Sequence, residues 1–216
     1  MSLWVKVCAN TSLADAMLGV DAGADAVGFV FAPSPRQVTT SQVAAITAAL
    51  PSAIEKIGVF ADSTFEEIAA AIETGGLTGV QLHFEGGEDL PALLRKRFGT
   101  ALRILHVLHY ALDVTDKAKE LAANESVDAI LVDSRTPTAI GGTGIRFDWD
   151  AAPALFRTAG KNMIVAGGLN PANVAEAVIR LKPWGVDVAS GVETRPGHKD
   201  PDKVRTFVEN ARNAKP

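Results

Sequence analysis

The stretch NMIVAGGLNPANVAEAVIRLKPWGVDVAS (162–190) contains the repeating unit from which the fold can be predicted. It begins with a short apolar run at 162–167, continues into a helical pattern at 170–181 and ends with a second apolar run at 185–190. A glycine pair and a proline separate the first run from the helical pattern, as is usual between a strand and a helix. The stretch therefore predicts two parallel strands joined by a helix.

The same alternation extends along the whole chain of 216 residues. We expect strands at 3–8, 26–31, 55–60, 79–83, 102–108, 128–133, 162–167 and 185–190. We expect helices at 12–23, 40–50, 64–75, 170–181 and 200–214. Eight βα units of this length close more naturally into a barrel than they extend as a doubly wound sheet, which remains an alternative. The sequence thus predicts an α/β fold, a single (βα)8 TIM barrel with one catalytic domain over 1–216.

Polar residues and glycines predict where several of these helices begin and end. Side chains that can cap a helix N-terminus occur at Thr11 or Ser12, Ser63, Asn170 and Asp200. Pro171 and Pro201 suit the first turn, and Gly23 and Gly75 are candidate C-terminal stops.

Composition restricts the class of protein. Hydrophobic residues make up 47% and charged residues 21%, which is typical of a folded globule. A net charge of −4 gives no reason to expect nucleic acid or a polybasic membrane contact. The single cysteine excludes an intramolecular disulfide, and no apolar run reaches the roughly 20 residues that span a bilayer. We expect a cytoplasmic protein with a small-molecule substrate.

Unusual residues fall at the carboxyl ends of the predicted strands, where βα barrels carry their chemistry. Cys8 ends the first strand, His83 the fourth and Asp133 the sixth, while Arg36 follows the second. Glycine turns at 141–144, 166–169 and 190–192 follow the last three strands. Because glycine lets backbone N–H groups approach an anion, these turns predict a phosphate site after strands six, seven and eight.

Each of these residues also has a purely structural interpretation. A lone buried cysteine is more often a small apolar side chain than a nucleophile or base. Asp133 could cap a loop or pair with Arg135 or Arg146, and His83 could be a histidine satisfied by one hydrogen bond. Arg36 could be an ordinary loop arginine, although flanking prolines restrict its backbone.

Several strings together resemble the phosphoribosylanthranilate isomerase family of tryptophan biosynthesis. They are KVC (6–8), GADAVGFVFAPSPRQV (23–38), GVF (58–60), QLH (81–83), LVDS (131–134), GGTGIRFDW (141–149), AGGLNPANV (166–174) and VDVASGVETRPGHKD (186–200). The resemblance implies that Cys8 is the general base, Asp133 the general acid and Arg36 the residue that holds the anthranilate carboxylate. It places the substrate phosphate at Gly142, Gly144, Gly167, Gly168, Ser190 and Gly191, and we expect His83 to bind substrate as well.

The sequence departs from this family pattern at three places. Ala9 and Asn10 follow Cys8 where the family has glycine and an aliphatic residue, Phe84 replaces a glycine, and GHKD (197–200) replaces an aliphatic-KD ending. We expect these changes to alter loop geometry near strands one and four.

The reaction implied by the resemblance is the Amadori rearrangement of N-(5-phosphoribosyl)anthranilate to 1-(2-carboxyphenylamino)-1-deoxyribulose 5-phosphate. This internal redox isomerisation needs neither a metal nor an organic cofactor, and we expect none. One alternative is the related isomerase of histidine biosynthesis, which uses two aspartates and repeated half-barrel phosphate motifs. Another is a barrel that binds a phosphorylated ligand without catalysis. The sequence leaves a monomer and a homodimer equally open.

Overall fold

Eight parallel strands close into a barrel in the computed structural model, which describes residues 2–83, 89–109, 114–133, 155–156 and 160–215. The strands are β1 (Trp4–Val7), β2 (Ala26–Val30), β3 (Glu55–Phe60), β4 (Gly79–Leu82), β5 (Arg103–His109), β6 (Ala129–Asp133), β7 (Asn162–Ala166) and β8 (Gly185–Val188). They are hydrogen-bonded in chain order, and β8 pairs with β1 to complete the ring. The predicted barrel is confirmed, and an open doubly wound sheet is excluded.

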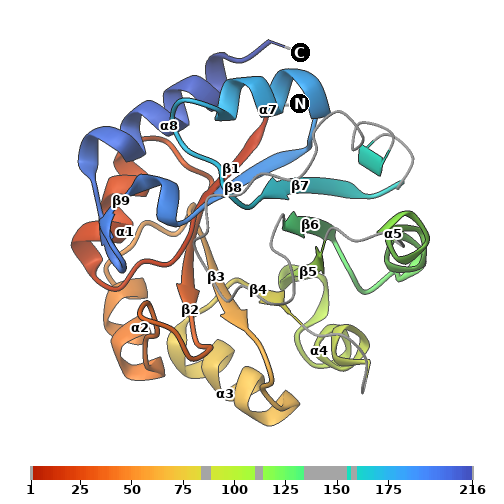
Figure 1. Cartoon of the computed structure of the whole chain (residues 1–216). Helices are drawn as coiled ribbons and strands as arrows, with labels where there is room; N and C mark the ends of the chain where they lie inside the picture. Colours follow the sequence, from red (N-terminus) through yellow and green to blue (C-terminus); the bar gives the residue numbers. More distant parts are fainter. Residues whose placement is uncertain (1, 84–88, 110–113, 134–154, 157–159, 216) are drawn as a thin grey trace.

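Helices surround this ring of strands (Figure 1). They are α1 (Leu13–Asp21), α2 (Thr40–Thr47), α3 (Phe65–Gly75), α4 (Leu90–Phe98), α5 (Val114–Ala123), α7 (Val174–Leu181) and α8 (Pro201–Asn213). After β8 the chain forms a 3-10 turn at Ser190–Val192 and a short antiparallel hairpin of β9 (Glu193–Arg195) and β10 (His198–Lys199). In the described part of the chain, none of the helices is long and apolar enough to cross a membrane.

Side chains alternate along each strand between the barrel interior and the helix layer. Ala129 and Leu131 of β6 belong to the interior apolar cluster, whereas Ile130 and Val132 pack against the helices. The same alternation directs Asp133 inward. In β1, Trp4 lies in the interior cluster and Val5 and Val7 lie in the outer one, so Lys6 points inward.

Two predicted helix starts are confirmed, and both predicted ends of α3 are wrong. Ser12 caps α1 by accepting a hydrogen bond from the Asp15 N–H at 3.1 Å, and Asp200 caps α8. Helix α3 is capped by Thr64 rather than Ser63, because Thr64 and Glu67 form a reciprocal capping box. It stops at Gly76 (φ 62°) rather than at Gly75, which is still helical.

The start of α7 also differs from the prediction. The helix begins at Val174, four residues after Asn170. The Asn170 side chain accepts a hydrogen bond from the Ala172 N–H at 2.9 Å and so closes a local turn. Asn173 fixes that turn to the loop after β7, since its Nδ2 donates to the Gly168 carbonyl at 2.9 Å.

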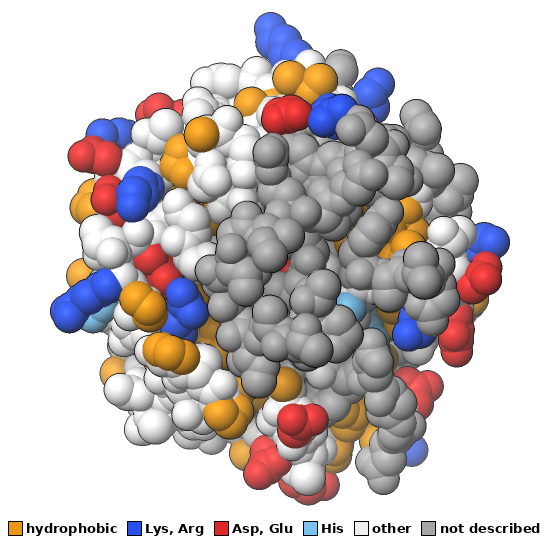
Figure 2. All heavy atoms as spheres, viewed as in Figure 1, with side chains coloured by type: hydrophobic (Ala, Val, Ile, Leu, Met, Phe, Trp, Pro, Cys, Tyr) orange, Lys and Arg blue, Asp and Glu red, His pale blue; other side chains and the backbone are white. Residues whose placement is uncertain are grey.

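Charged side chains of both signs are spread around the periphery of the face in Figure 2. Some charged side chains of the barrel exterior form ion pairs, such as Arg97–Glu73 at 2.8 Å. Among the described residues on this face, no large basic patch is visible (Figure 2).

Candidate active site

Cys8 lies directly after β1 and is 5% exposed. Its N–H donates to the Val188 carbonyl at 2.7 Å, which continues the β1–β8 ladder by one residue. The neighbouring strand β2 makes room for the thiol at Gly28, where an added Cβ would come within 2.6 Å of Cys8 Sγ and 3.0 Å of Lys6 Cε. The sulfur and the Lys6 side chain therefore converge on one point inside the barrel.

Lys6 is completely buried, and its Nζ donates to Asp187 Oδ1 of β8 and to Gln81 Oε1 of β4, both at 2.8 Å. Burial acts to lower the pKa of Lys6, but the charge of Asp187, joined by that of Cys8 whenever the thiol is ionised, outweighs it and the pKa is raised. The ammonium form therefore persists beside Cys8 at neutral pH.

The Cys8 thiol has a raised pKa, mainly because burial disfavours its thiolate form. The positive charges of Lys6 and Lys199 act in the opposite direction, and the negative charge of Asp187 acts with burial. Without a ligand, Cys8 is accordingly a neutral thiol near neutral pH.

The Lys6 contact continues through Gln81 to His83. Because the Gln81 Oε1 atom accepts from the ammonium, its Nε2 is a donor, and it lies 2.9 Å from His83 Nε2. That nitrogen must accept the bond, which places the imidazole proton on Nδ1. Asp187, Lys6, Gln81 and His83 thus form one hydrogen-bonded chain across β8, β1 and β4.

Asp133 is the last residue of β6 and is 1% exposed. It points into the barrel three strand positions from β1, so its carboxyl group and the Cys8 thiol both face the interior but from different parts of the ring. Its ladder partner is His109 of β5, whose ring lies 6.1 Å from that of His83. Arg135 and Arg146, the partners considered for Asp133, lie outside the described residues.

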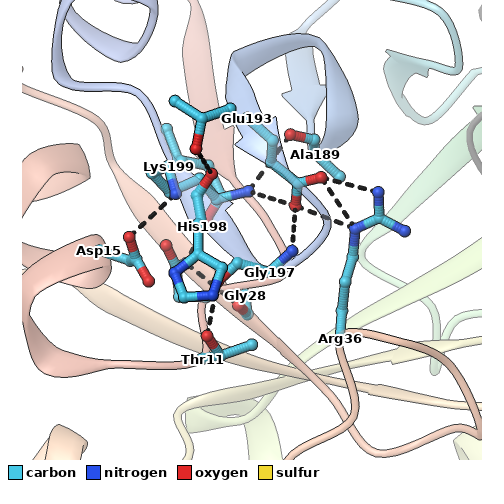
Figure 3. Close-up of polar contacts among 12 residues, drawn as sticks. Thr11, Asp15, Gly28, Arg36, Ala189, Glu193, Gly197, His198 and Lys199 are labelled. Atoms are coloured by element: carbon cyan, nitrogen blue, oxygen red, sulfur yellow. Dashed lines mark hydrogen bonds and ion pairs between the residues drawn. The ribbon is translucent and has the colours of Figure 1, made fainter.

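Arg36 lies in the turn between β2 and α2, as predicted, but its partner was not foreseen. Its guanidinium makes a forked ion pair with Glu193, with Nε–Oε1 at 2.9 Å and Nη2–Oε2 at 2.7 Å (Figure 3). Glu193 begins β9 and its side chain is only 3% exposed. Arg36 is therefore fixed against the hairpin that follows β8.

The glycine turns after β7 and β8 lie against each other. Gly167 and Gly168 adopt positive φ angles of 79° and 67°, which favour glycine. A Cβ on Gly191 would overlap the Leu169 carbonyl oxygen, so only glycine allows the two turns to approach this closely. Ser190 is exposed beside them. Gly142 and Gly144, the other predicted phosphate positions, lie outside the described residues.

Backbone geometry after Cys8 explains one departure from the family pattern. Ala9 has a φ of 64°, a left-handed conformation that glycine adopts without strain. Asn10 is fully buried and secures the loop, since its Nδ2 donates to the Val7 carbonyl at 2.8 Å and to the Gly28 carbonyl at 3.1 Å. The loop thus holds an alanine in a conformation that suits a glycine.

Four residues of the site were missed by the sequence interpretation: Lys6, Gln81, Asp187 and Glu193. The first three carried a usable signal, because each is a polar residue at an inward position of an otherwise apolar strand. Glu193 carried none, since nothing in its neighbourhood indicates that its partner lies 157 residues away. Over the described ranges, no three His, Cys, Asp or Glu side chains gather into a metal-binding group.

A closed barrel with an inward thiol and an inward carboxyl group, and with paired glycine turns after β7 and β8, defines a class of protein. It is an α/β-barrel enzyme whose site is equipped for proton transfer on a small anionic substrate.

Comparison with known proteins identifies the family. The model of the N-(5'phosphoribosyl)anthranilate (PRA) isomerase family matches residues 5–210. The N-(5'-phosphoribosyl)anthranilate isomerase of Citrifermentans bemidjiense is 43% identical over 215 residues, covering 96% of each chain. The crystal structure of phosphoribosyl anthranilate isomerase from Thermotoga maritima superposes with a TM-score of 0.85 at 36% identity, covering 97% of this chain and 98% of that one. Another solved isomerase, in complex with reduced 1-(o-carboxyphenylamino)-1-deoxyribulose 5-phosphate, has a TM-score of 0.81 at 33% identity, covering 97% of this chain and 98% of that one.

The chain belongs to the N-(5'-phosphoribosyl)anthranilate isomerase family. It is an isomerase of the intramolecular oxidoreductase type, and its reaction is the Amadori rearrangement of N-(5-phosphoribosyl)anthranilate in tryptophan biosynthesis. The family match does not support the alternatives of a histidine-pathway isomerase and of a barrel without catalysis.

Proposed function

We propose that Cys8 and Asp133 carry out the proton transfers of this isomerisation. The observation that carries the proposal is their placement: both are buried and inward-facing at the carboxyl ends of strands that lie three positions apart in one barrel. Asp133 acts as the general acid and donates a proton to the furanose ring oxygen, the bond from C1 to that oxygen breaks, and an iminium forms between C1 and the anthranilate nitrogen. The Cys8 thiolate then removes the proton from C2. The resulting enol amine becomes the product when C1 gains a proton and the C2 hydroxyl loses one, so no external oxidant is consumed.

The iminium supplies the additional positive charge that the Cys8 thiolate needs for its stabilisation. Burial keeps the pKa of Cys8 raised in the free enzyme despite Lys6 and Lys199. An iminium beside the sulfur adds a further positive charge and lowers the cost of forming the thiolate. Cys8 therefore becomes a base when the intermediate that it must deprotonate is present.

Replacement of each residue tests these roles. We expect Cys8→Ala and Asp133→Asn each to reduce kcat by roughly 10²-fold or more. The Kd of the reduced product analogue should change little, because neither group supplies most of the binding. The fluorescence loss of freshly generated substrate measures turnover, and Glu73→Gln, which alters an exposed ion pair, is the control. Turnover like that of the parent enzyme in either variant would overturn the assignment.

We propose that the substrate phosphate binds at Gly167, Gly168, Ser190 and Gly191, together with Gly142 and Gly144. The positive φ angles of Gly167 and Gly168 and the close approach of Gly191 to Leu169 support an anion cradle. Gly191→Ala should raise the KM for the phosphorylated substrate and weaken inorganic phosphate as a competitive inhibitor. Inhibition by phosphate that is unchanged in this variant would contradict the site.

We further propose that Arg36 binds the anthranilate carboxylate and that His83 contacts the substrate. The exposed part of the Arg36 side chain, 16%, leaves room for a ligand beside Glu193. Arg36→Ala should raise KM more than it lowers kcat, and an unchanged KM would count against the role. His83→Ala should also raise KM, and an unchanged KM there would remove His83 from the binding site.

We also infer that residues 1–216 form one catalytic domain and that the enzyme works in the cytoplasm as a homodimer or monomer. The match over 5–210 supports one domain. Phosphorylated biosynthetic intermediates and a base that must stay a free thiol both suit a reducing cytoplasm. The Thermotoga maritima isomerase is described as dimeric, and monomers of it have been generated. Sedimentation equilibrium would distinguish the two states.

A further inference from the structure

Glu193 lies between two cations that come from different parts of the chain (Figure 3). Arg36 approaches from the loop after β2, and Lys199 approaches from β10 with its Nζ 3.3 Å from Glu193 Oε1. The side chain of Lys199 is fully buried and that of Glu193 nearly so. One carboxylate is thus shared by two positive charges in a place with little water to screen them.

The pair with Glu193 uses only one edge of the Arg36 guanidinium. Its Nε and Nη2 atoms donate to the two carboxylate oxygens. Among the described residues, none accepts a hydrogen bond from Nη1. A guanidinium has a second edge, formed by Nη1 and the remaining hydrogen of Nη2, that fits another carboxylate in the same forked manner.

Glu193 is itself held rigidly by the hairpin. Its Oε1 accepts from the Gly197 N–H at 3.3 Å, and the Gly197 carbonyl accepts from Thr11 Oγ1 at 2.6 Å. The Lys199 N–H donates to Asp15 Oδ1 at 2.9 Å, which fixes β10 to the start of α1. The hairpin is therefore tied to the segment that follows Cys8, and it holds Arg36 in a defined position relative to that segment.

Burial acts to raise the pKa of Glu193, but the hydrogen bond from Arg36 and the charge of Lys199 outweigh it and hold the pKa below its usual value. The carboxylate is thus charged at neutral pH. Without that charge, Arg36 and Lys199 would repel each other and the long Arg36 side chain would be free to change rotamer.

We propose that Glu193 is a positioning residue that presents the free edge of Arg36 to the substrate's aromatic carboxylate. The inference rests on the proposed role of Arg36 and goes beyond it, because it assigns carboxylate selectivity to an ion pair and not to a single arginine. Glu193 does not touch the substrate in this arrangement; it acts through Arg36.

The binding of two ligands distinguishes a positioning role of Glu193 from a general effect on protein stability. One is reduced 1-(o-carboxyphenylamino)-1-deoxyribulose 5-phosphate, and the other is the same molecule without its carboxyl group. Glu193→Gln keeps the shape of the side chain and removes its charge. We expect it to weaken binding of the carboxylated ligand roughly tenfold, by loss of the charge-assisted pair, and to leave the other ligand's Kd within about twofold. In turnover, KM should rise while kcat changes little.

Three further variants complete the experiment. Arg36→Met should lose the same carboxylate selectivity, and the double variant with Glu193→Gln should lose no more than Arg36→Met alone. Glu193→Asp, which keeps the charge but withdraws it by one methylene, should show an intermediate loss and serves if Glu193→Gln does not fold. Glu73→Gln is the matched control for removal of a carboxylate from an exposed ion pair.

Each other result overturns the proposal. Equal weakening of both ligands by Glu193→Gln would make Glu193 merely structural, and no weakening of either would remove its role. If Arg36→Met weakens only the carboxylated ligand and Glu193→Gln does not, the inference about Glu193 fails while the proposed role of Arg36 stands. If Arg36→Met changes the Kd of both ligands equally, the proposed role of Arg36 fails and the inference about Glu193 fails with it.

Discussion

Gly28 of β2 and Cys8 after β1 lie side by side in the barrel, and the missing side chain of Gly28 leaves the space that the thiol fills. A Cβ at Gly28 would lie 2.6 Å from Cys8 Sγ, closer than a Cβ approaches other atoms in proteins, and 3.2 Å from the Cys8 Cα, which is a tight contact. Gly28 thus helps to set the position of the proposed base because it has no side chain.

Gly28→Ala should therefore displace the sulfur and impair catalysis. We expect kcat to fall by about 10²-fold, as displacement of a catalytic group by an ångström can cause. The free energy of unfolding should fall by about 1–3 kcal/mol through overpacking. Gly75→Ala is the matched control, because a Cβ there meets nothing closer than 3.5 Å. Full activity in Gly28→Ala would show that the thiol position is not critical.

The raised pKa of Cys8 predicts slow alkylation of the ligand-free enzyme. At pH 7 iodoacetamide should modify Cys8 more slowly than a free cysteine, and the rate should climb only at alkaline pH.

The raised pKa of Cys8 also predicts how the free energy of unfolding changes with pH. Below the pKa of an unfolded cysteine, about 8.5, the thiol is neutral in both the folded and the unfolded protein, so it adds no pH dependence to the free energy of unfolding. Above that pKa the thiol loses its proton in the unfolded protein before it does so in the folded one, so the free energy of unfolding falls as pH rises. Urea unfolding from pH 7 to pH 10 should show this loss in the parent protein and less of it in Cys8→Ala.

Removal of the negative charge of Asp187 should make the Cys8 thiol more acidic. Asp187 acts to raise the Cys8 pKa, while Lys6 and Lys199 lower it. In Asp187→Asn the two cations remain, so the alkylation rate at pH 8 should increase. The protein should lose about 3 kcal/mol or more of stability, because Lys6 keeps its charge in the barrel without a counterion. Asp202→Asn, whose carboxylate is 83% exposed, is the control. Slower alkylation of Asp187→Asn would contradict this account.

The left-handed conformation of Ala9 predicts a stabilising substitution. Ala9→Gly should raise the free energy of unfolding by about 0.5–1 kcal/mol, because relief of strain exceeds the entropy that glycine gains in the unfolded chain. Ala70→Gly, at an exposed position within α3, should do the opposite and cost about 1 kcal/mol. The comparison of the two by thermal denaturation separates backbone strain from a general effect of glycine. Destabilisation by Ala9→Gly would mean that the loop after Cys8 carries no strain.

The strands could be predicted because each is a short apolar run bounded by turn residues, and their ends are accurate to one or two residues. Cys8 and Asp133 could be predicted because a parallel barrel brings the carboxyl ends of its strands to one rim. Helix starts were less certain, since Ser63 and Thr64 are equally good caps until the Glu67 partner is in place. The charge pairs of the site could not be predicted, because each depends on strands or loops that meet only when the ring closes.

The pair formed by Arg36 and Glu193 joins residues 157 positions apart, and Lys199 contacts Asp15 across 184. We expect contacts of such separation to form late in folding, since the entropy of loop closure must be overcome before they are gained. A partly folded barrel of β2 to β7 would carry Asp133 but neither the β1–β8 ladder nor the support for Arg36. Ligand binding through the aromatic carboxylate should thus appear only with the last step of folding, and it can serve as a kinetic marker of barrel closure.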